Sequence, residues 1–164
     1  MVDRLTHVDE SGAARMVDVS GKDVTARTAT ATGRFVTTRE VIALLRSDGL
    51  TKGDALAIAR IAGIAGAKRT PDLVPLCHPV ALHGVTVDLA VHEDSIEITA
   101  TTRTADRTGV EMEALTSVVV AGLALYDMVK EVDRAAQLTD VRLLAKAGGR
   151  SGEWSRERDV GGTP

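Results

Sequence analysis

Val85–Val91 (VTVDLAV) and Ser95–Thr102 (SIEITATT) are the two stretches of sequence that decide the fold. In both stretches apolar and polar residues alternate, and a period of two is typical of half-buried β-strands. Only His92 to Asp94 separate them, so the two strands are predicted to form an antiparallel hairpin. An antiparallel sheet is therefore the centre of the predicted fold.

Outside the hairpin, periodicity and capping residues predict two further strands and three helices. The strands are expected at Thr28–Phe35 and Thr139–Lys146, and the helices at Arg39–Arg46, from Thr51 to about Lys68, and from about Val110 to Arg134. Without one helix the order is β-α-β-β-α-β, the ferredoxin-like arrangement. The predicted class is thus α+β, with a ferredoxin-like antiparallel sheet, helices on one face and one additional helix.

Length and composition favour a single domain over residues 1–164. The chain is 44% hydrophobic and 26% charged, which is close to the globular average and excludes wholesale disorder. Residues 1–26 are polar and aperiodic and are expected to form a mobile N-terminal arm. Residues 151–164 are charged and contain glycine, so we expect a flexible tail there.

Composition also excludes several classes of partner. The net charge is −3 and aromatic residues make up 2% of the chain, so an RNA-binding sheet with stacking platforms is disfavoured and no nucleic-acid partner is expected. No long uncharged apolar run or signal peptide is present, which argues against a membrane partner. The single cysteine fits a reducing compartment, and the predicted location is cytoplasmic.

The candidate chemistry rests on isolated residues, because the sequence has no dinucleotide or P-loop fingerprint and no zinc-site spacing. No metal site is therefore expected. Cys77 is interpreted as a wall residue. His78, next to a proline in a segment that cannot be helical, is equally consistent with a buried structural histidine and with a phosphate donor or proton shuttle. Lys52, in the first turn of its predicted helix, opposes the helix dipole and suggests an anion site.

The long helix carries a second set of candidates. Asp127 and Lys130 are three residues apart and can pair on one face of the helix. Glu113 and Asp127 share a face but lie about 21 Å apart along the helix, so one small substrate cannot touch both in one chain. Two such helices packed antiparallel about a two-fold axis would bring them together. Gly122, near the middle of the helix, would suit a close helix crossing.

Taken together, the motifs resemble the MoaC family, the cyclic pyranopterin monophosphate synthases of molybdenum cofactor biosynthesis. The matching stretches, in chain order, are Leu5–His7, Met16–Ser20, Lys52–Asp54, Ala59–Ile64, Ala67–Thr70, Pro75–Pro79, Thr108–Thr116, Tyr126–Met128 and Val141–Lys146. Each stretch alone is modest, but their number and order are specific. The resemblance covers essentially Leu5 to Gly152 and leaves only the tail outside it.

The resemblance implies a lyase that converts (8S)-3′,8-cyclo-7,8-dihydroguanosine 5′-triphosphate to cyclic pyranopterin monophosphate and diphosphate. It also implies a homohexamer of three dimers, with active sites at the dimer interfaces. The implied catalytic residues are Asp127, Lys130, Lys52 and His78. The implied substrate-binding residues are Leu76, Cys77, His78, Met112, Glu113, Arg27, Glu111 and Lys146. Met112 and Glu113 are expected to come from the partner chain. No cofactor is implied, although Mg²⁺ could accompany the triphosphate.

Two further interpretations stay open on the sequence. One is a non-catalytic ferredoxin-like regulatory module that binds a small ligand at its dimer interface. The other is a degenerate paralogue that keeps the fold without the activity. The regulatory module predicts that replacing Asp127 alters affinity or assembly and changes no chemistry.

Overall fold

The predicted hairpin is present as β2 (Gly84–Val91) and β3 (Ser95–Asp106) in a computed structural model that describes residues 7–9, 11–47, 50 and 53–156. Strand β1 (Thr25–Val36) pairs with β3 and with β4 (Gln137–Ala147), and every pairing is antiparallel. The sheet order is β2-β3-β1-β4-β5. Its first four strands have the ferredoxin-like order, which confirms the predicted fold class.

The fifth strand was not predicted. Trp154 and Ser155 form β5 (Trp154–Ser155) and pair with Lys146 and Ala145 at the edge of β4. The start of the segment expected to be a flexible tail therefore extends the sheet, while residues 157–164 lie outside the described part of the chain.

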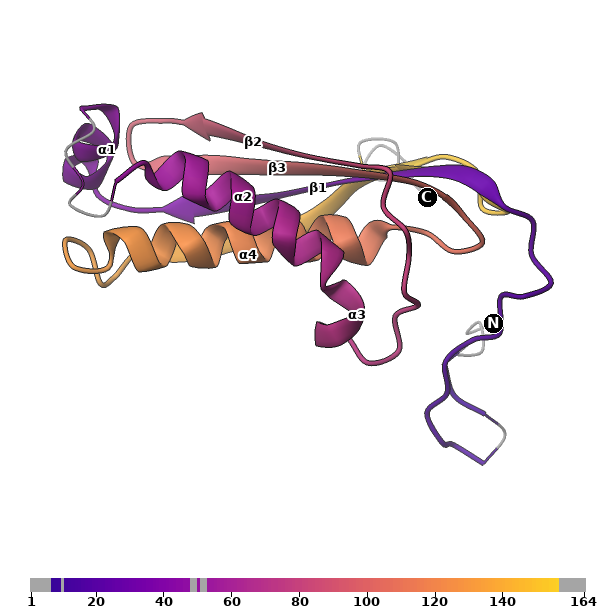
Figure 1. Cartoon of the computed structure of the whole chain (residues 1–164). Helices are drawn as coiled ribbons and strands as arrows, with labels where there is room; N and C mark the ends of the chain where they lie inside the picture. The colour runs from indigo at the N-terminus through magenta and orange to yellow at the C-terminus, as the bar shows by residue number, and fades with distance from the viewer. Residues whose placement is uncertain (1–6, 10, 48–49, 51–52, 157–164) are drawn as a thin grey trace, which may run out of the picture.

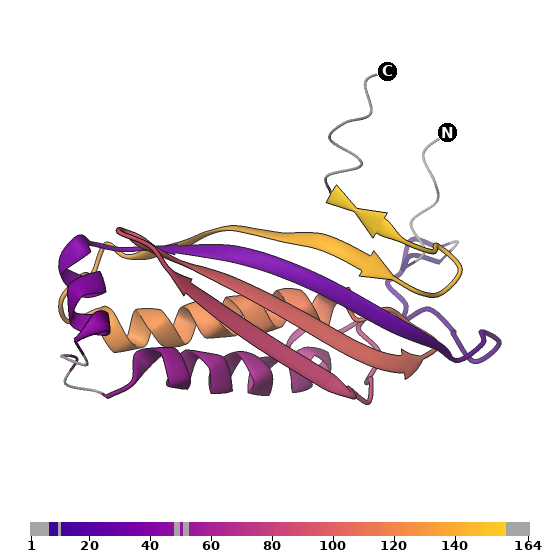
Figure 2. The same cartoon turned by 90° about the horizontal axis from the view of Figure 1, so that it is seen from above.

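The helices are α1 (Arg39–Arg46), α2 (Ala55–Lys68), α3 (Thr70–Leu73) and α4 (Glu111–Val129). Seen from above, α2 and α4 lie side by side against one face of the sheet, and α1 sits at one end of it (Figure 2). α3 is a single turn that follows α2 and leads into the long connection to β2 (Figure 1). The bounds of α1 match the prediction, because the Thr38 hydroxyl accepts a hydrogen bond from the Val41 N–H and caps the helix locally.

The core lies between the sheet and α4. Phe35, Ile96, Ile98, Val118 and Leu125 are all fully buried there. Small residues in α2 allow it to pack closely on α4: a Cβ on Gly66 would lie 2.7 Å from Val120 of α4. The two helices therefore pack closely at this position.

Two predicted helix ends are wrong. Helix α2 begins at Ala55, not Thr51, because Asp54 is its N-cap and accepts a hydrogen bond from the Ala57 N–H. Helix α4 ends at Val129, not Arg134, because the chain leaves the helix in a tighter turn, in which the Val132 N–H bonds to the Val129 carbonyl three residues back.

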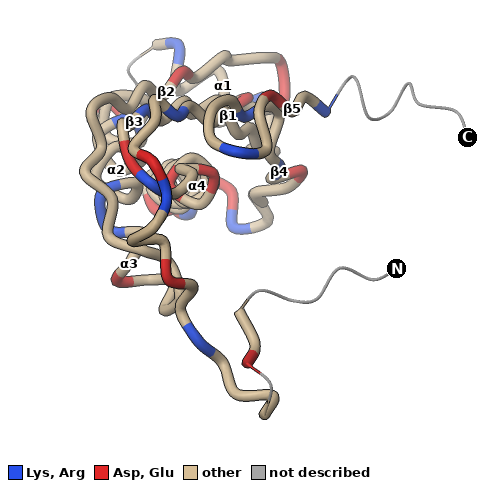
Figure 3. The backbone as a smooth tube through the Cα atoms, turned by 90° about the vertical axis from the view of Figure 1, so that its right-hand side faces the viewer, with Lys and Arg blue, Asp and Glu red and all other residues tan. Residues whose placement is uncertain are grey.

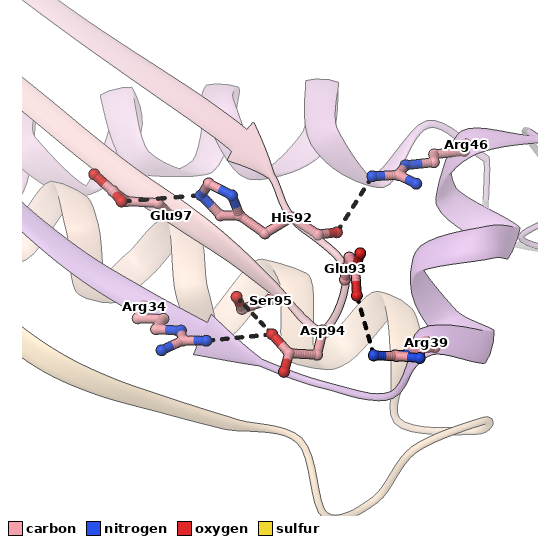
Figure 4. Close-up of polar contacts among 8 residues, drawn as sticks. All are labelled: Arg34, Arg39, Arg46, His92, Glu93, Asp94, Ser95 and Glu97. Carbon is pink, nitrogen blue, oxygen red and sulfur yellow. Dashed lines mark hydrogen bonds and ion pairs between the residues drawn. The ribbon is translucent and has the colours of Figure 1, made fainter.

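The hairpin loop is tied to α1 and β1 at the end of the sheet where α1 lies (Figure 4). Arg39 bonds Glu93 at 3.0 Å, and Arg34 bonds Asp94 at 3.2 Å. Arg46 donates to the His92 carbonyl. These exposed pairs fix the loop and lie far from the cavities described below.

On length and composition alone α4 could cross a membrane, the one helix among the described residues that could. It packs instead against β1, β3, β4 and α2, with Ala114, Val118 and Leu125 fully buried. This is the environment of a core helix.

Candidate active site

A cavity of about 140 Å³ lies beside the first turn of α4, and we call it the His78 cavity. Its lining residues are His7, Leu76, Cys77, His78, Thr108, Gly109, Glu111, Met112 and Glu113. The sequence prediction named six of these as site residues, from two stretches more than 30 residues apart in the chain. The fold brings the two stretches together here within one chain, whereas Met112 and Glu113 were expected to come from the partner chain.

The connection between α3 and β2 positions the Leu76–His78 side of this cavity. The Cys77 N–H donates to the Val74 carbonyl and closes a turn, and Pro75 and Pro79 keep the segment from becoming a helix. The other side is formed by the start of α4, which follows directly after Thr108 and Gly109. Both walls are therefore fixed by backbone structure.

Glu113 is a buried carboxyl group in the wall of this cavity, with only 3% of the residue exposed. Burial raises its pKa, and the nearby Glu111 carboxylate raises the pKa further. Burial also raises the pKa of the Cys77 thiol, with a smaller effect from the charge of Glu113. A thiol with a raised pKa is a poor nucleophile, which agrees with the interpretation of Cys77 as a wall residue.

His78 joins this cavity to the N-terminal arm. Its Nε2 lies 2.6 Å from the Val17 carbonyl oxygen, and the ring can donate to that oxygen. The neighbouring Asp18 carboxylate has a lowered pKa, because it accepts hydrogen bonds from Ser20 and feels the His78 ring charge. The arm is thus anchored to the candidate site at this point.

A second cavity of about 160 Å³, the Arg27 cavity, shares Thr108, Gly109 and Glu111 with the first. Lys146 of β4 bonds Glu111 at 2.9 Å across it. The Nε of Arg27 donates to the Asp106 carbonyl at 2.8 Å, which orients its guanidinium group. The predicted companions Arg27, Glu111 and Lys146 therefore lie together, next to the His78 cavity.

Three basic residues near Arg27 were missed by the sequence prediction. Lys22 and Arg107 line the Arg27 cavity, and Lys22 and Arg150 line an adjoining hollow of about 360 Å³. The Arg107 Nε donates to the Lys22 carbonyl, which holds the two segments side by side. Figure 3 views the molecule from this end and shows basic positions near acidic ones. These residues come from three loops far apart in sequence, so no local spacing could have revealed the cluster.

Asp127 and Lys130 lie at the opposite end of α4. The Lys130 Nζ donates to Asp127 Oδ1 at 2.6 Å, which confirms the predicted pair. This hydrogen bond and the Asp127 charge raise the pKa of Lys130. A 19-residue helix is about 28 Å long, so one chain does not bring this pair to the His78 cavity.

Three sequence arguments about these helices need correction. Lys52 lies outside the described residues, and since α2 begins at Ala55 the argument from a first-turn cation is wrong. Gly122 packs against Leu138 of β4, where an added Cβ would lie 2.7 Å from the leucine, and not against another helix. Glu113 and Asp127 share a helix face by angle, but their environments differ, since Glu113 is buried and Asp127 is exposed. The Leu76–His78 segment lies beside the first turn of α4, where Glu113 is, and not beside Asp127.

Within the described residues, no group of three or more His, Cys, Asp or Glu side chains is placed to hold a metal ion. The titratable side chains around the two cavities include a carboxyl and a histidine in one and a basic cluster in the other.

Comparisons with known proteins identify the family of this chain. A family model described as the MoaC family matches residues 16–149. The cyclic pyranopterin monophosphate synthase of Streptomyces coelicolor is 68% identical over 154 residues, which span 94% of this chain and 91% of that protein. Cyclic pyranopterin monophosphate synthase 2 of Mycobacterium tuberculosis is 60% identical over 152 residues, which span 93% of this chain and 91% of that protein. The cyclic pyranopterin monophosphate synthase of Corynebacterium glutamicum is 54% identical over 152 residues, which span 93% of this chain and 97% of that protein. This chain belongs to the MoaC family.

Proposed function

We propose that this chain converts (8S)-3′,8-cyclo-7,8-dihydroguanosine 5′-triphosphate to cyclic pyranopterin monophosphate and diphosphate, an early step of molybdenum cofactor biosynthesis. The relatives reported above carry the name of this activity and cover nearly the whole chain. The observation that carries the proposal is the adjacency of the two cavities. Acid–base side chains line one, and a basic cluster lines the other.

The reaction needs proton transfers, because rings must open and close again. The proposed catalytic groups are Asp127 as acid and base, Lys130 beside it, and Lys52 and His78. Glu113 supports this assignment, since a buried carboxyl with a raised pKa can hold a proton closer to neutral pH. Leu76, Cys77 and Met112 would form the walls against which the substrate lies.

The reaction also needs cations where diphosphate leaves. Arg27 and Lys146 would bind the triphosphate, with Glu111 holding the Lys146 ammonium in place. Arginine guanidinium groups bind phosphate oxygens in pairs, and the Arg27 group is already oriented by its bond to Asp106. No resident cofactor is proposed, and Mg²⁺ would enter with the triphosphate.

The complete site would be built from two chains. Met112, Val119, Leu123 and Tyr126 form an exposed stripe along α4, and Ile61 of α2 is 67% exposed. Exposed apolar surface of this kind is typical of an interface between subunits. Antiparallel packing of two α4 helices would bring Asp127 and Lys130 of one chain to the His78 cavity of the other. We propose a homohexamer of three such dimers, acting in the cytoplasm.

The experiment is a single-turnover conversion of the cyclised dihydroguanosine triphosphate by the native chain and by Asp127→Asn. Pterin and diphosphate are measured together, with oligomer size and substrate binding measured alongside. The proposal expects the native chain to form both products, and the variant to keep binding and assembly but lose turnover by at least about a hundredfold.

The regulatory-module hypothesis predicts a different result. In that case the native chain and the variant both bind the substrate and neither converts it. A degenerate paralogue would give the same outcome, and either would overturn the proposed activity.

A further inference from the structure

Lys130 lies just beyond the last residue of α4. Its N–H bonds to the Tyr126 carbonyl as the C-cap of the helix, whereas Asp127 belongs to the last helical turn. The direction in which the Lys130 side chain leaves the backbone therefore depends on the turn that follows the helix, as well as on the helix itself.

A buried carboxylate holds that turn. Asp133 is only 8% exposed, and both of its oxygens are used. Oδ2 accepts from the Thr37 hydroxyl at 2.8 Å, and Oδ1 accepts from the Ala135 N–H at 2.9 Å. The Asp133 N–H in turn donates to the Val129 carbonyl at 3.0 Å, so the carboxylate, the turn and the helix end are joined.

Thr37 anchors this arrangement to the sheet. It follows the last residue of β1, is itself buried, and donates its N–H to the Asp94 carbonyl in the hairpin loop. Burying a carboxylate is costly unless hydrogen bonds satisfy it, and here the donors come from two different parts of the chain. The helix end is thereby tied to the end of β1, which is paired on both sides within the sheet.

We propose that Asp133 and Thr37 are positioning residues that hold Lys130 in place beside Asp127. They touch no substrate and act through the turn after α4. This inference rests on the proposed function, in which Asp127 and Lys130 are catalytic. It adds a pair of residues that the resemblance and the motifs do not mark.

Other groups around Lys130 are also relevant to its titration. Asp127, Glu131 and Tyr126 each favour its charged form, and the hydrogen bond that Lys130 donates to Asp127 has the largest effect. Tyr126 also donates its hydroxyl to the Arg134 carbonyl, a second tie across the same turn. Loosening the turn should weaken the Asp127 contact while leaving the neighbouring Glu131 in the chain.

The test compares three single variants of the full chain. Thr37→Val removes the hydroxyl that donates to Asp133, and Thr37→Ser keeps it. Thr32→Val is the matched control, because Thr32 is also buried, belongs to β1, and donates its hydroxyl to the Ile98 carbonyl away from α4. Asp133→Asn, which preserves shape, serves as a second probe if Thr37→Val folds poorly.

The first readout is the pKa of Lys130, followed by NMR in protein labelled at lysine carbons, with the Lys130 signal assigned from Lys130→Arg. Thr37→Val should lower this pKa toward the ordinary value of lysine, whereas Thr37→Ser and Thr32→Val should leave it unchanged. The second readout is turnover. Thr37→Val should lower kcat about tenfold or more with little change in KM, and the alkaline limb of the kcat profile should move to lower pH.

The proposal is overturned if Thr37→Val leaves the Lys130 pKa and kcat at native values. It is also overturned if Thr32→Val causes the same losses, because the effect would then be general destabilisation. A native chain without turnover would contradict the proposed function alone. In that event the Lys130 titration still decides whether the turn positions this lysine.

Discussion

Glu113 is the site residue whose environment differs most from what its sequence position indicates. It lies in the first turn of a helix, where an exposed carboxylate would be favoured by the helix dipole, yet it is buried. The Leu76–His78 segment causes this by covering the helix start from a distant part of the chain. The i,i+3 pair of Asp127 and Lys130, in contrast, was predictable because both partners lie on one helix.

Replacing Glu113 by Gln should stabilise the folded chain at neutral pH. The pKa of Glu113 is raised by burial, so the native chain loses stability as pH rises from the ordinary carboxyl range through this raised pKa. The variant carries no such charge and escapes the loss. Thermal unfolding between about pH 4 and about pH 7.5 should show an advantage of the variant that grows with pH.

The thiol of Cys77 provides an internal control for that experiment. Since the Glu113 charge contributes to the raised pKa of Cys77, the variant thiol should react with iodoacetamide at slightly lower pH than the native thiol. The shift should be small, because burial is the larger cause. If the difference in stability between the variant and the native chain is the same at every pH, the account of Glu113 is contradicted.

At the scale of elements, local signals were sufficient where an element is stabilised by its own residues. Helix α1 is capped by Thr38, and its apolar stripe lies within its own eight residues. Its bounds were therefore predicted correctly from local sequence. The end of α4 was not predicted correctly, and the turn that follows it contains Asp133, whose partner Thr37 lies 96 residues away in the chain. Strand β5 likewise exists only as a partner of β4.

The packing of α2 on α4 provides a test at this scale. Gly66→Ala would raise helix propensity, but the new Cβ would lie 2.7 Å from Val120, a contact that neither backbone can relieve easily. The steric conflict should dominate and lower the free energy of unfolding by about 1–3 kcal/mol. Urea unfolding of the variant measures this.

The control for that change is the double variant Gly66→Ala with Val120→Ala. Removing the valine methyl groups takes away the Cγ contacts at 2.7 and 3.1 Å and leaves the Cβ contact at 2.7 Å. The double variant should therefore lose less stability than the sum of the two single changes. Strict additivity of the two effects would show that contact with the Val120 methyl groups is not the reason a glycine is needed at position 66.

At the scale of the whole molecule, a net charge of −3 does not describe the surface that an anionic substrate would meet. Lys22, Arg27, Arg107 and Lys146 gather around one cavity, although the chain as a whole is acidic. The sequence could predict Arg27 and Lys146 only through the family resemblance. Lys22 and Arg107 could be assigned to this cluster only from the structure, in which both line the same cavity.

This cluster predicts a salt dependence of catalysis. Raising ionic strength should increase KM for the triphosphate substrate and leave kcat nearly constant, because screening weakens attraction and not chemistry. Arg107→Gln should raise KM severalfold at low salt and reduce the salt dependence. Arg39→Gln, which removes an exposed arginine paired with Glu93 at the other end of the sheet, is the control and should change neither. Equal effects of the two variants would contradict a local anion site.

The central claim is that catalysis joins the two ends of α4 from different chains. The most direct measurement is the activity of assemblies made by co-expressing His78→Ala with Asp127→Asn chains under different affinity tags. Random mixing of two chains in a dimer should restore about a quarter of native activity, because half of the dimers are mixed and one of their two sites is intact. Co-expressed His78→Ala and Glu113→Ala chains, both altered at the same end of α4, should restore none. Mixed His78→Ala and Asp127→Asn assemblies that are as inactive as their parents would contradict a site shared between chains.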